Sequence, residues 1–127
     1  MTWWPSEHVP DEDRLFMRVH RCYYPEGQLN TGVFRDHGAG MSTDWEKYST
    51  PTETRDRARS PNENGVISLI ARQVRAIPPL VVRHTPDPDT MNRAHTDVIG
   101  EKSPRVRIML SRILRWEIRI PPETCPT

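Results

Sequence analysis

Residues 92–100 read Asn-Arg-Ala-His-Thr-Asp-Val-Ile-Gly, and this stretch organises the rest of the chain. His95 and Asp97 stand two residues apart, so a strand points both side chains to one face of a sheet. A second polar strand, Arg18-Val19-His20, lies near the start of the chain. If the two strands belong to one sheet, imidazole, carboxylate and guanidinium groups share a face and form a small site.

The chain has 127 residues, 13 of them proline, and is 35% hydrophobic. This length favours a single domain, which we expect over residues 14–120, after an irregular arm (1–13) and before a tail (121–127). Frequent prolines predict short elements joined by long ordered loops. Trp3 and Trp4 are expected to anchor the arm, on the chain's own core or on a partner.

Alternation of apolar and polar residues predicts several short strands. The run that begins at Gly65 is the most apolar, and a helix over Val66–Ile77 also fits its 3.6-residue period. Its β-branched residues favour a strand followed by a helical turn around Arg72–Ala76. The expected strands are Arg14–Tyr24, Leu29–Phe34, Gly65–Ala71, Leu80–His84 and the stretch around His95.

Capping signals predict three helices. Thr43 with Glu46 forms one capping-box pattern. A second pattern has Thr50 as N-cap, with Pro51 and Glu53 in the first turn, and predicts a helix that ends near Arg59. The last helix begins at Ser103-Pro104 and has an apolar face. We therefore expect the α+β class: a small, mostly antiparallel sheet with short helices and one docked C-terminal helix. The apolar face of the last helix consists of Val106, Met109, Leu110 and Ile113.

Charge and cysteine content narrow the function classes. The formal net charge is +1, which gives no global electrostatic reason for nucleic-acid binding. Cys22 and Cys125 are the only cysteines, which is typical of a reducing, cytoplasmic setting. The chain starts with no signal-peptide pattern, and no apolar run approaches the ~20 residues of a membrane span. We therefore expect a cytoplasmic protein with no membrane segment.

The principal candidate site combines His20 with His95. Two histidines on neighbouring strands share acid and base roles in metal-independent ribonucleases. Asp97 would orient an imidazole, so these three residues are the predicted catalytic group. The alternative is that both histidines are hydrogen-bonded structural residues. The predicted substrate-binding residues are Arg18, Ser42, Tyr48 and Arg83.

Three further patterns in the sequence are compatible with binding sites. His20, His84, His95 and Asp97 are metal-ligand types, but their spacing matches no zinc pattern, so no metal site is assigned. Segment 38–48, a glycine-bearing loop before a capped helix, could hold an anion or be an ordinary surface cap. Arginines of the last helix could contact nucleic acid or an acidic protein, or form a solvated face. This arginine stripe comprises Arg105, Arg112, Arg115 and Arg119.

The order Arg-Val-His, Met41-Ser42-Thr43-Asp44-Trp45 and Ala94-His95 resembles a group of small bacterial proteins with no assigned function. More distantly, the layout resembles the ADP-ribosyltransferase and RNA phosphotransferase fold, with Arg18 or His20, Ser42 and Tyr48 at that fold's site positions. The resemblance implies NAD binding and ribosyl chemistry. Two departures stand against it: Asp97 replaces the late-strand glutamate, and the chain is short for that fold.

Two functional hypotheses follow. The first is a small enzyme that acts on a nucleotide or RNA phosphate, with a toxin or defence protein as one setting for that activity. The second is a non-catalytic adaptor or subunit that binds a protein partner through the N-terminal arm or the arginine stripe. The sequence identifies no cofactor.

Overall fold

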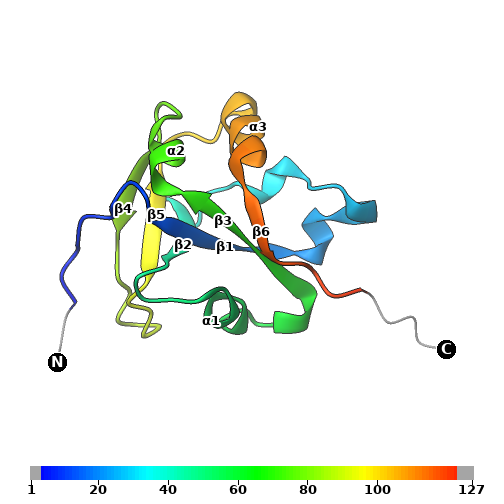
Figure 1. The fold of residues 1–127 in the computed structure, drawn as a ribbon, viewed down its shortest axis with the longest axis horizontal. Helices are drawn as coiled ribbons and strands as arrows, with labels where there is room; N and C mark the ends of the chain where they lie inside the picture. The colour runs from blue at the N-terminus through cyan, green and yellow to red at the C-terminus, as the bar shows by residue number, and fades with distance from the viewer. Residues whose placement is uncertain (1–3, 123–127) are drawn as a thin grey trace.

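The structure is a computed structural model that describes residues 4–122. Six strands form one antiparallel sheet in the order β4-β5-β2-β1-β3-β6 (Figure 1), which confirms the predicted α+β class. The strands are β1 (Arg14–His20), β2 (Met41–Trp45), β3 (Asn64–Ile70), β4 (Val81–His84), β5 (His95–Ile99) and β6 (Arg115–Ile118). The α-helices are α1 (Pro51–Asp56), α2 (Ala71–Arg75) and α3 (Pro104–Ile113). Short 3₁₀ helices occupy Arg21–Tyr23, Pro25–Gly27, Thr31–Val33 and Pro61–Glu63.

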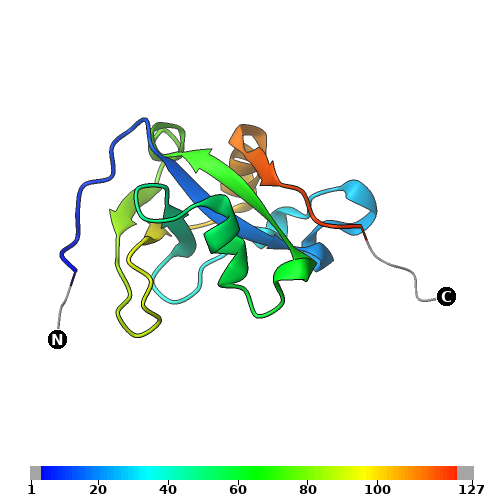
Figure 2. The same ribbon diagram turned by 60° about the horizontal axis from the view of Figure 1, so that its bottom comes forward.

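The two faces of the sheet differ in character. One face is apolar and is covered by α2 and α3, whereas α1 lies on the other face (Figures 1 and 2). Leu15, Trp45 and Leu69 lie side by side on the apolar face and are almost wholly buried. Val74 of α2 and Leu110 of α3 are both 0% exposed and complete this core. Burying side chains of this size is the main driving force for the fold.

The centre of the sheet is a seam between two halves. β1 pairs with β3 over seven residues, and β2 pairs with β5 over four. Between β1 and β2, however, only Leu15↔Trp45 and Phe16↔Asp44 are paired. Beyond these two pairs the strands diverge, so the halves β4-β5-β2 and β1-β3-β6 open away from each other. Residues of both strands past the seam therefore have no cross-strand neighbour there and can line a cavity.

Several sequence predictions are confirmed. Thr50 and Glu53 form the expected reciprocal capping box at α1. Ser103 caps α3 with Pro104 at its first position. The apolar run after Asn64 is a strand, followed at once by α2, so the helix alternative over Val66–Ile77 is wrong.

Other predictions are wrong, each for a physical reason. The Thr43 capping pattern does not start a helix: Thr43 lies in β2 and its hydroxyl donates to the Thr96 carbonyl of β5 at 2.8 Å. The predicted strand Leu29–Phe34 is instead a loop with a 3₁₀ turn, which Asn30 caps by accepting from Gly32 N. The first strand ends at His20, where the chain turns into a 3₁₀ helix rather than continuing to Tyr24.

The arginine stripe is broken in the structure. Helix α3 ends at Ile113, and the chain continues as edge strand β6, paired with β3. Arg115 and Arg119 therefore do not share a helix face with Arg105 and Arg112. Pairing with β3 overrides the helical period of this segment, a non-local effect that the period does not encode.

The N-terminal arm is attached to the domain. Val9 is 1% exposed and belongs to the core, while carbonyls of Asp11 and Asp13 accept from the first backbone N–H groups of α2. Trp4 is half-buried; Trp3, Cys125 and most of the predicted tail lie outside the described residues. No helix within residues 4–122 is both long and apolar enough to cross a membrane.

A polar contact fastens β6 to β3 and predicts a pH effect. Glu117 accepts from Arg115 Nε at 2.6 Å and from the buried Ser68 hydroxyl at 2.8 Å. The Arg115 hydrogen bond, helped by that of Ser68, lowers the pKa of Glu117 below 4.5. A depressed folded-state pKa gives stability that is present above the unfolded value and is lost as pH falls through the folded value.

We therefore expect Glu117→Gln to lower the melting temperature near neutral pH. The deficit should shrink as pH falls below 4.5, because the wild-type carboxylate then loses its advantage. Melting followed by circular dichroism across this pH range measures the effect. Glu12→Gln, at an exposed position, is the matched control. A deficit that stays constant with pH would contradict the assignment.

Candidate active site

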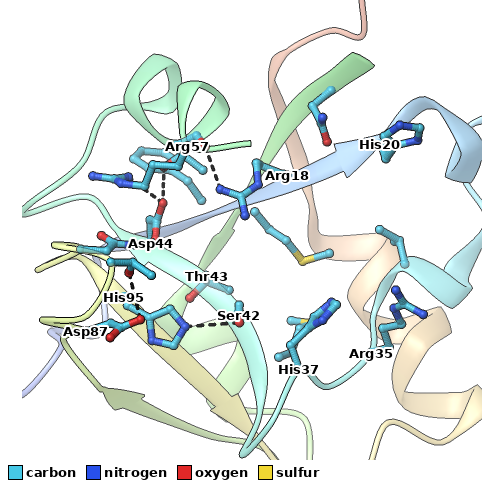
Figure 3. Close-up of a pocket in the computed structure, with 18 of the residues that line it drawn as sticks. Arg18, His20, Arg35, His37, Ser42, Thr43, Asp44, Arg57, Asp87 and His95 are labelled. Carbon is cyan, nitrogen blue, oxygen red and sulfur yellow. Dashed lines mark hydrogen bonds and ion pairs between the residues drawn. The ribbon is translucent and has the colours of Figure 1, made fainter. Parts of the chain in front are cut away.

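A pocket of about 710 Å³ lies where β1 and β2 diverge (Figure 3). Met17, Val33 and Met41 contribute apolar surface to it from the core. Polar side chains converge on it from β1, β2, β5, α1 and the segment between β1 and β2. These polar groups include Arg18, His20, Arg35, His37, Ser42, Asp44, Arg57 and His95, and the loop before β5 adds Asp87, Thr90 and Asn92.

His95 is held in one orientation and one tautomer. Its Nδ1 lies 3.0 Å from both the carbonyl oxygen and the hydroxyl oxygen of Thr85. A carbonyl oxygen only accepts, so we assign the proton of the neutral ring to Nδ1. The lone pair is then on Nε2, which lies 3.3 Å from the Ser42 hydroxyl. His95 thus presents a proton acceptor toward Ser42 and the pocket.

The Asp97 carboxylate lies beside this imidazole. Its Oδ2 accepts from the Thr85 hydroxyl at 3.0 Å, and its Oδ1 is 4.0 Å from His95 Nε2. Among the residues that the structure describes, buried Oδ1 has no hydrogen-bond partner. A proton taken up at Nε2 would create a positive charge next to this oxygen. Asp97 is therefore placed to stabilise a protonated His95.

A second buried carboxylate, Asp44, anchors α1 at the edge of the pocket. Its Oδ2 accepts from the Thr54 hydroxyl at 2.9 Å and from Arg57 Nη1 at 2.8 Å. Its Oδ1 accepts from the Asn92 amide at 2.8 Å. These partners satisfy a carboxylate that is only 5% exposed. Asp44 is therefore structural, and it neutralises Arg57.

The rest of the pocket wall is rich in positive charge. Arg18 donates from Nη1 to the Thr54 carbonyl at 3.1 Å, and the Arg35 guanidinium lies 5.8 Å from the centre of the Tyr23 ring. Within residues 4–122, neither arginine is in ion-pair contact with a carboxylate. The exposed imidazole of His37 lies on the Arg35 side of the pocket, between Arg35 and Ser42 in the view of Figure 3. An anion entering the pocket would meet the charges of Arg18 and Arg35, with the carboxylate of Asp87 on the His95 side of the wall (Figure 3).

His20 and His95 line the same pocket but are not in contact. They lie on β1 and β5, with β2 between them, at opposite ends of the pocket (Figure 3). In a regular sheet, two strand spacings of ~4.8 Å and four residues of ~3.3 Å place their Cα atoms about 16 Å apart. Divergence of β1 from β2 adds to this separation. The predicted direct pairing of these two imidazoles is therefore not what the strand order produces.

The remaining predicted substrate-binding residues divide into two groups. Arg18 and Ser42 line the pocket. Arg83 is exposed on edge strand β4, outside the pocket wall. Tyr48 stacks under the Arg93 guanidinium at 4.3 Å and donates its hydroxyl proton to Glu7, away from the pocket. Hydrogen bonds from Lys47 and Tyr48 lower the pKa of Glu7, which joins the N-terminal arm to the domain.

His84 and segment 38–48 have other roles in the structure than the metal and anion-binding patterns suggested. His84 is 1% exposed: its Nδ1 accepts from Glu7 N, and its Nε2 lies 2.7 Å from the Arg93 carbonyl. Both ring nitrogens are thus occupied within the fold. Among residues 4–122, no group of three or more histidine, cysteine, aspartate and glutamate side chains is arranged to hold a metal ion. Segment 38–48 contains β2 rather than the start of a helix, so both alternatives for it, an anion site at a helix terminus and an ordinary surface cap, are wrong.

Sequence reasoning missed four residues of this site. Thr85 fixes the tautomer of His95, and Asp44 anchors α1. Arg35 and His37 come from the segment between the predicted strand Leu29–Phe34 and β2. The only sequence signal for them was the run of charged and basic residues in 35–37, shortly before the polar stretch 42–44.

Comparisons of the chain with protein-family models, with curated proteins and with solved structures find no match. The resemblance to the ADP-ribosyltransferase and RNA phosphotransferase fold stays a prediction.

A substitution at Thr85 tests whether its hydroxyl stabilises the buried Asp97 carboxylate. Thr85→Val removes the donor to Asp97 Oδ2 and leaves a buried carboxylate without that partner. We expect a loss of roughly 1–3 kcal/mol in the free energy of unfolding, measured by urea denaturation. Thr90→Val is the control, since Thr90 is exposed and its hydroxyl contacts only the loop residue Asp87. Equal losses in both variants would show that the Thr85 hydroxyl has no special role.

Proposed function

We propose that this protein is an enzyme that acts on the phosphate of a nucleotide or RNA bound in the pocket between β1 and β2. The observation that carries the proposal is the contact of His95 Nδ1 with the Thr85 carbonyl, which leaves the Nε2 lone pair directed toward Ser42 in a pocket that Arg18 and Arg35 also line. A base beside an anion site is the arrangement that phosphate chemistry needs.

Each group has a role in this proposal. His95 removes a proton from the attacking hydroxyl and carries it as an imidazolium, which Asp97 stabilises. Arg18 binds the phosphate oxygens and offsets the charge that develops on them. Arg57 is bound to the Asp44 carboxylate, whereas the hydrogen bond of Arg18 goes to the neutral Thr54 carbonyl, so Arg18 is the better candidate for this role.

His20 takes a different role from the one that the sequence predicted. The backbone N–H of Cys22 donates to His20 Nδ1 at 3.0 Å, so the neutral ring carries its proton on Nε2. At the far end of the pocket this N–H is a donor for a second part of an extended substrate. A pocket of about 710 Å³ has the volume of a site for a molecule the size of a nucleotide.

The adaptor remains the alternative from another class. Two observations make it the second candidate. Ser6 and Glu7 of the arm bind the chain's own His84, and the arginine stripe is divided between α3 and β6. Neither surface on which the adaptor was based is thus a continuous free face among the described residues.

Replacing the proposed base tests the enzyme hypothesis. We expect His95→Gln to lower turnover by about 10²–10⁴-fold, because general-base catalysis contributes that much. Purified protein is assayed on a panel of single-stranded RNA, mononucleotides, dinucleotides and NAD. His8→Gln, at an exposed histidine of the arm, is the control and should keep full activity. No turnover of any panel member by the wild-type protein, together with a stable hetero-complex, would favour the adaptor.

Replacing the proposed anion-binding residue tests the second role. Arg18→Gln should reduce kcat/KM by about 10- to 100-fold, since a hydrogen bond to a charged group is lost. The loss should be smaller at high salt, where the wild-type electrostatic attraction is screened. Arg59→Gln, at an exposed position outside the pocket wall, is the matched control. An unchanged kcat/KM for Arg18→Gln would remove Arg18 from the site.

A further inference from the structure

We infer that Ser42 is the nucleophile of this site and forms a covalent phosphoseryl intermediate. The inference rests on the proposed function and goes beyond it, because a general base at His95 would serve equally for direct attack by water or by a substrate hydroxyl. Three features of the structure favour Ser42 as the attacking group.

The first feature is the direction of the hydrogen bond between Ser42 and His95. Thr85 holds the proton of His95 on Nδ1, so Nε2 only accepts. At 3.3 Å the Ser42 hydroxyl must therefore be the donor. This is the resting state that a serine nucleophile requires, with its proton already directed at the base that will take it. The distance is at the long end for such a pair, as is common before substrate binds.

The second feature is the rigidity of the strand that presents Ser42. β2 pairs with β5 through Met41↔Val98, Ser42↔Asp97 and Thr43↔Thr96. The residues on either side of Ser42 are buried at 1% and 3% exposure, whereas Ser42 itself is half-buried and lines the pocket. The serine Oγ is thus fixed by its neighbours and still open to a bound molecule.

The third feature is the group that faces Ser42. β1 and β2 are last paired at Phe16↔Asp44, and Arg18 and Ser42 are each two residues beyond that pair on their own strands. Figure 3 shows their side chains on opposite walls of the pocket. A phosphate bound to the Arg18 guanidinium would thus present its phosphorus to Ser42 Oγ.

The proposed step balances as follows. Ser42 Oγ forms a bond to phosphorus as its proton passes to His95 Nε2, and the bond from phosphorus to the leaving oxygen breaks. The protonated Nε2 then gives its proton to that leaving oxygen. In the second half, water attacks the phosphoseryl phosphorus, its proton passes to Nε2, and Ser42 Oγ leaves and regains a proton. No metal ion or redox partner enters the balance.

An organophosphorus fluoride that labels nucleophilic serines tests this without knowledge of the natural substrate. Diisopropyl fluorophosphate should add once to the full-length protein: the serine Oγ–phosphorus bond forms, fluoride leaves, and the hydroxyl proton goes to His95. Intact mass spectrometry and peptide mapping should locate the adduct on Ser42. His95→Gln, which keeps the serine, should slow labelling at least 100-fold. Ser42→Ala should abolish labelling, and Ser111→Ala, at a surface serine of α3, should leave it unchanged.

The outcomes separate this inference from the proposed function. Turnover of a panel phosphate that survives in Ser42→Ala, with no probe adduct in the wild type, overturns the nucleophile and leaves the phosphate enzyme standing. A His95-dependent adduct on Ser42 without turnover of any panel phosphate supports the nucleophile and overturns the proposed substrate class. Slow labelling spread over several serines, unaffected by His95→Gln, overturns the nucleophile as well. Melting temperatures of the variants show whether a lost adduct reflects a lost fold.

Discussion

The pairing of Phe16 with Asp44 is the constraint on which the rest of the structure depends. It is the last contact between β1 and β2, so it fixes where the two halves of the sheet separate and how deep the pocket becomes. The Asp44 side chain at this point also binds α1 and the loop before β5. One residue thus joins both halves of the sheet, the helix on the open face and one edge of the pocket. Its buried carboxylate is tolerated because every oxygen has a partner.

Local signals in the sequence predicted much of the fold. The capping residues of α1 and α3 satisfy backbone N–H groups within three positions along the chain, so a short pattern is enough to predict them. The alternation in β1 and β5 predicted correctly which side chains share a face, because that depends only on strand geometry. β2 and β6 were not predicted, because their conformation depends on contacts with distant parts of the chain. Thr43 and Trp116 take extended conformations because distant strands pair with them, and this overrides their local preferences.

The same distinction explains the result for the site. Period-two geometry placed His95 with Asp97 on one face and Arg18 with His20 on one face, and the structure agrees. How far apart those pairs lie depends on the order of strands, which the residues themselves do not state. β2 is inserted between β1 and β5, so Ser42, rather than His20, becomes the neighbour of His95. The role of Thr85 depends on its backbone carbonyl oxygen, which contacts His95 Nδ1. A pattern of side chains in the sequence does not reveal a backbone contact of this kind.

The Thr85 hydroxyl links Asp97 to His95 through contacts that the folded protein makes by itself. These side chains therefore lose their rotational freedom when the protein folds. The hydroxyl and carbonyl groups of Thr85 are then already oriented around the imidazole. A ligand entering this space meets a preorganised environment, so its affinity is not reduced by the entropy of ordering these groups. The entropy of ordering these groups is instead lost when the domain folds, which lowers its stability. The buried Asp97 oxygen, which has no hydrogen-bond partner among the described residues, lowers the stability further.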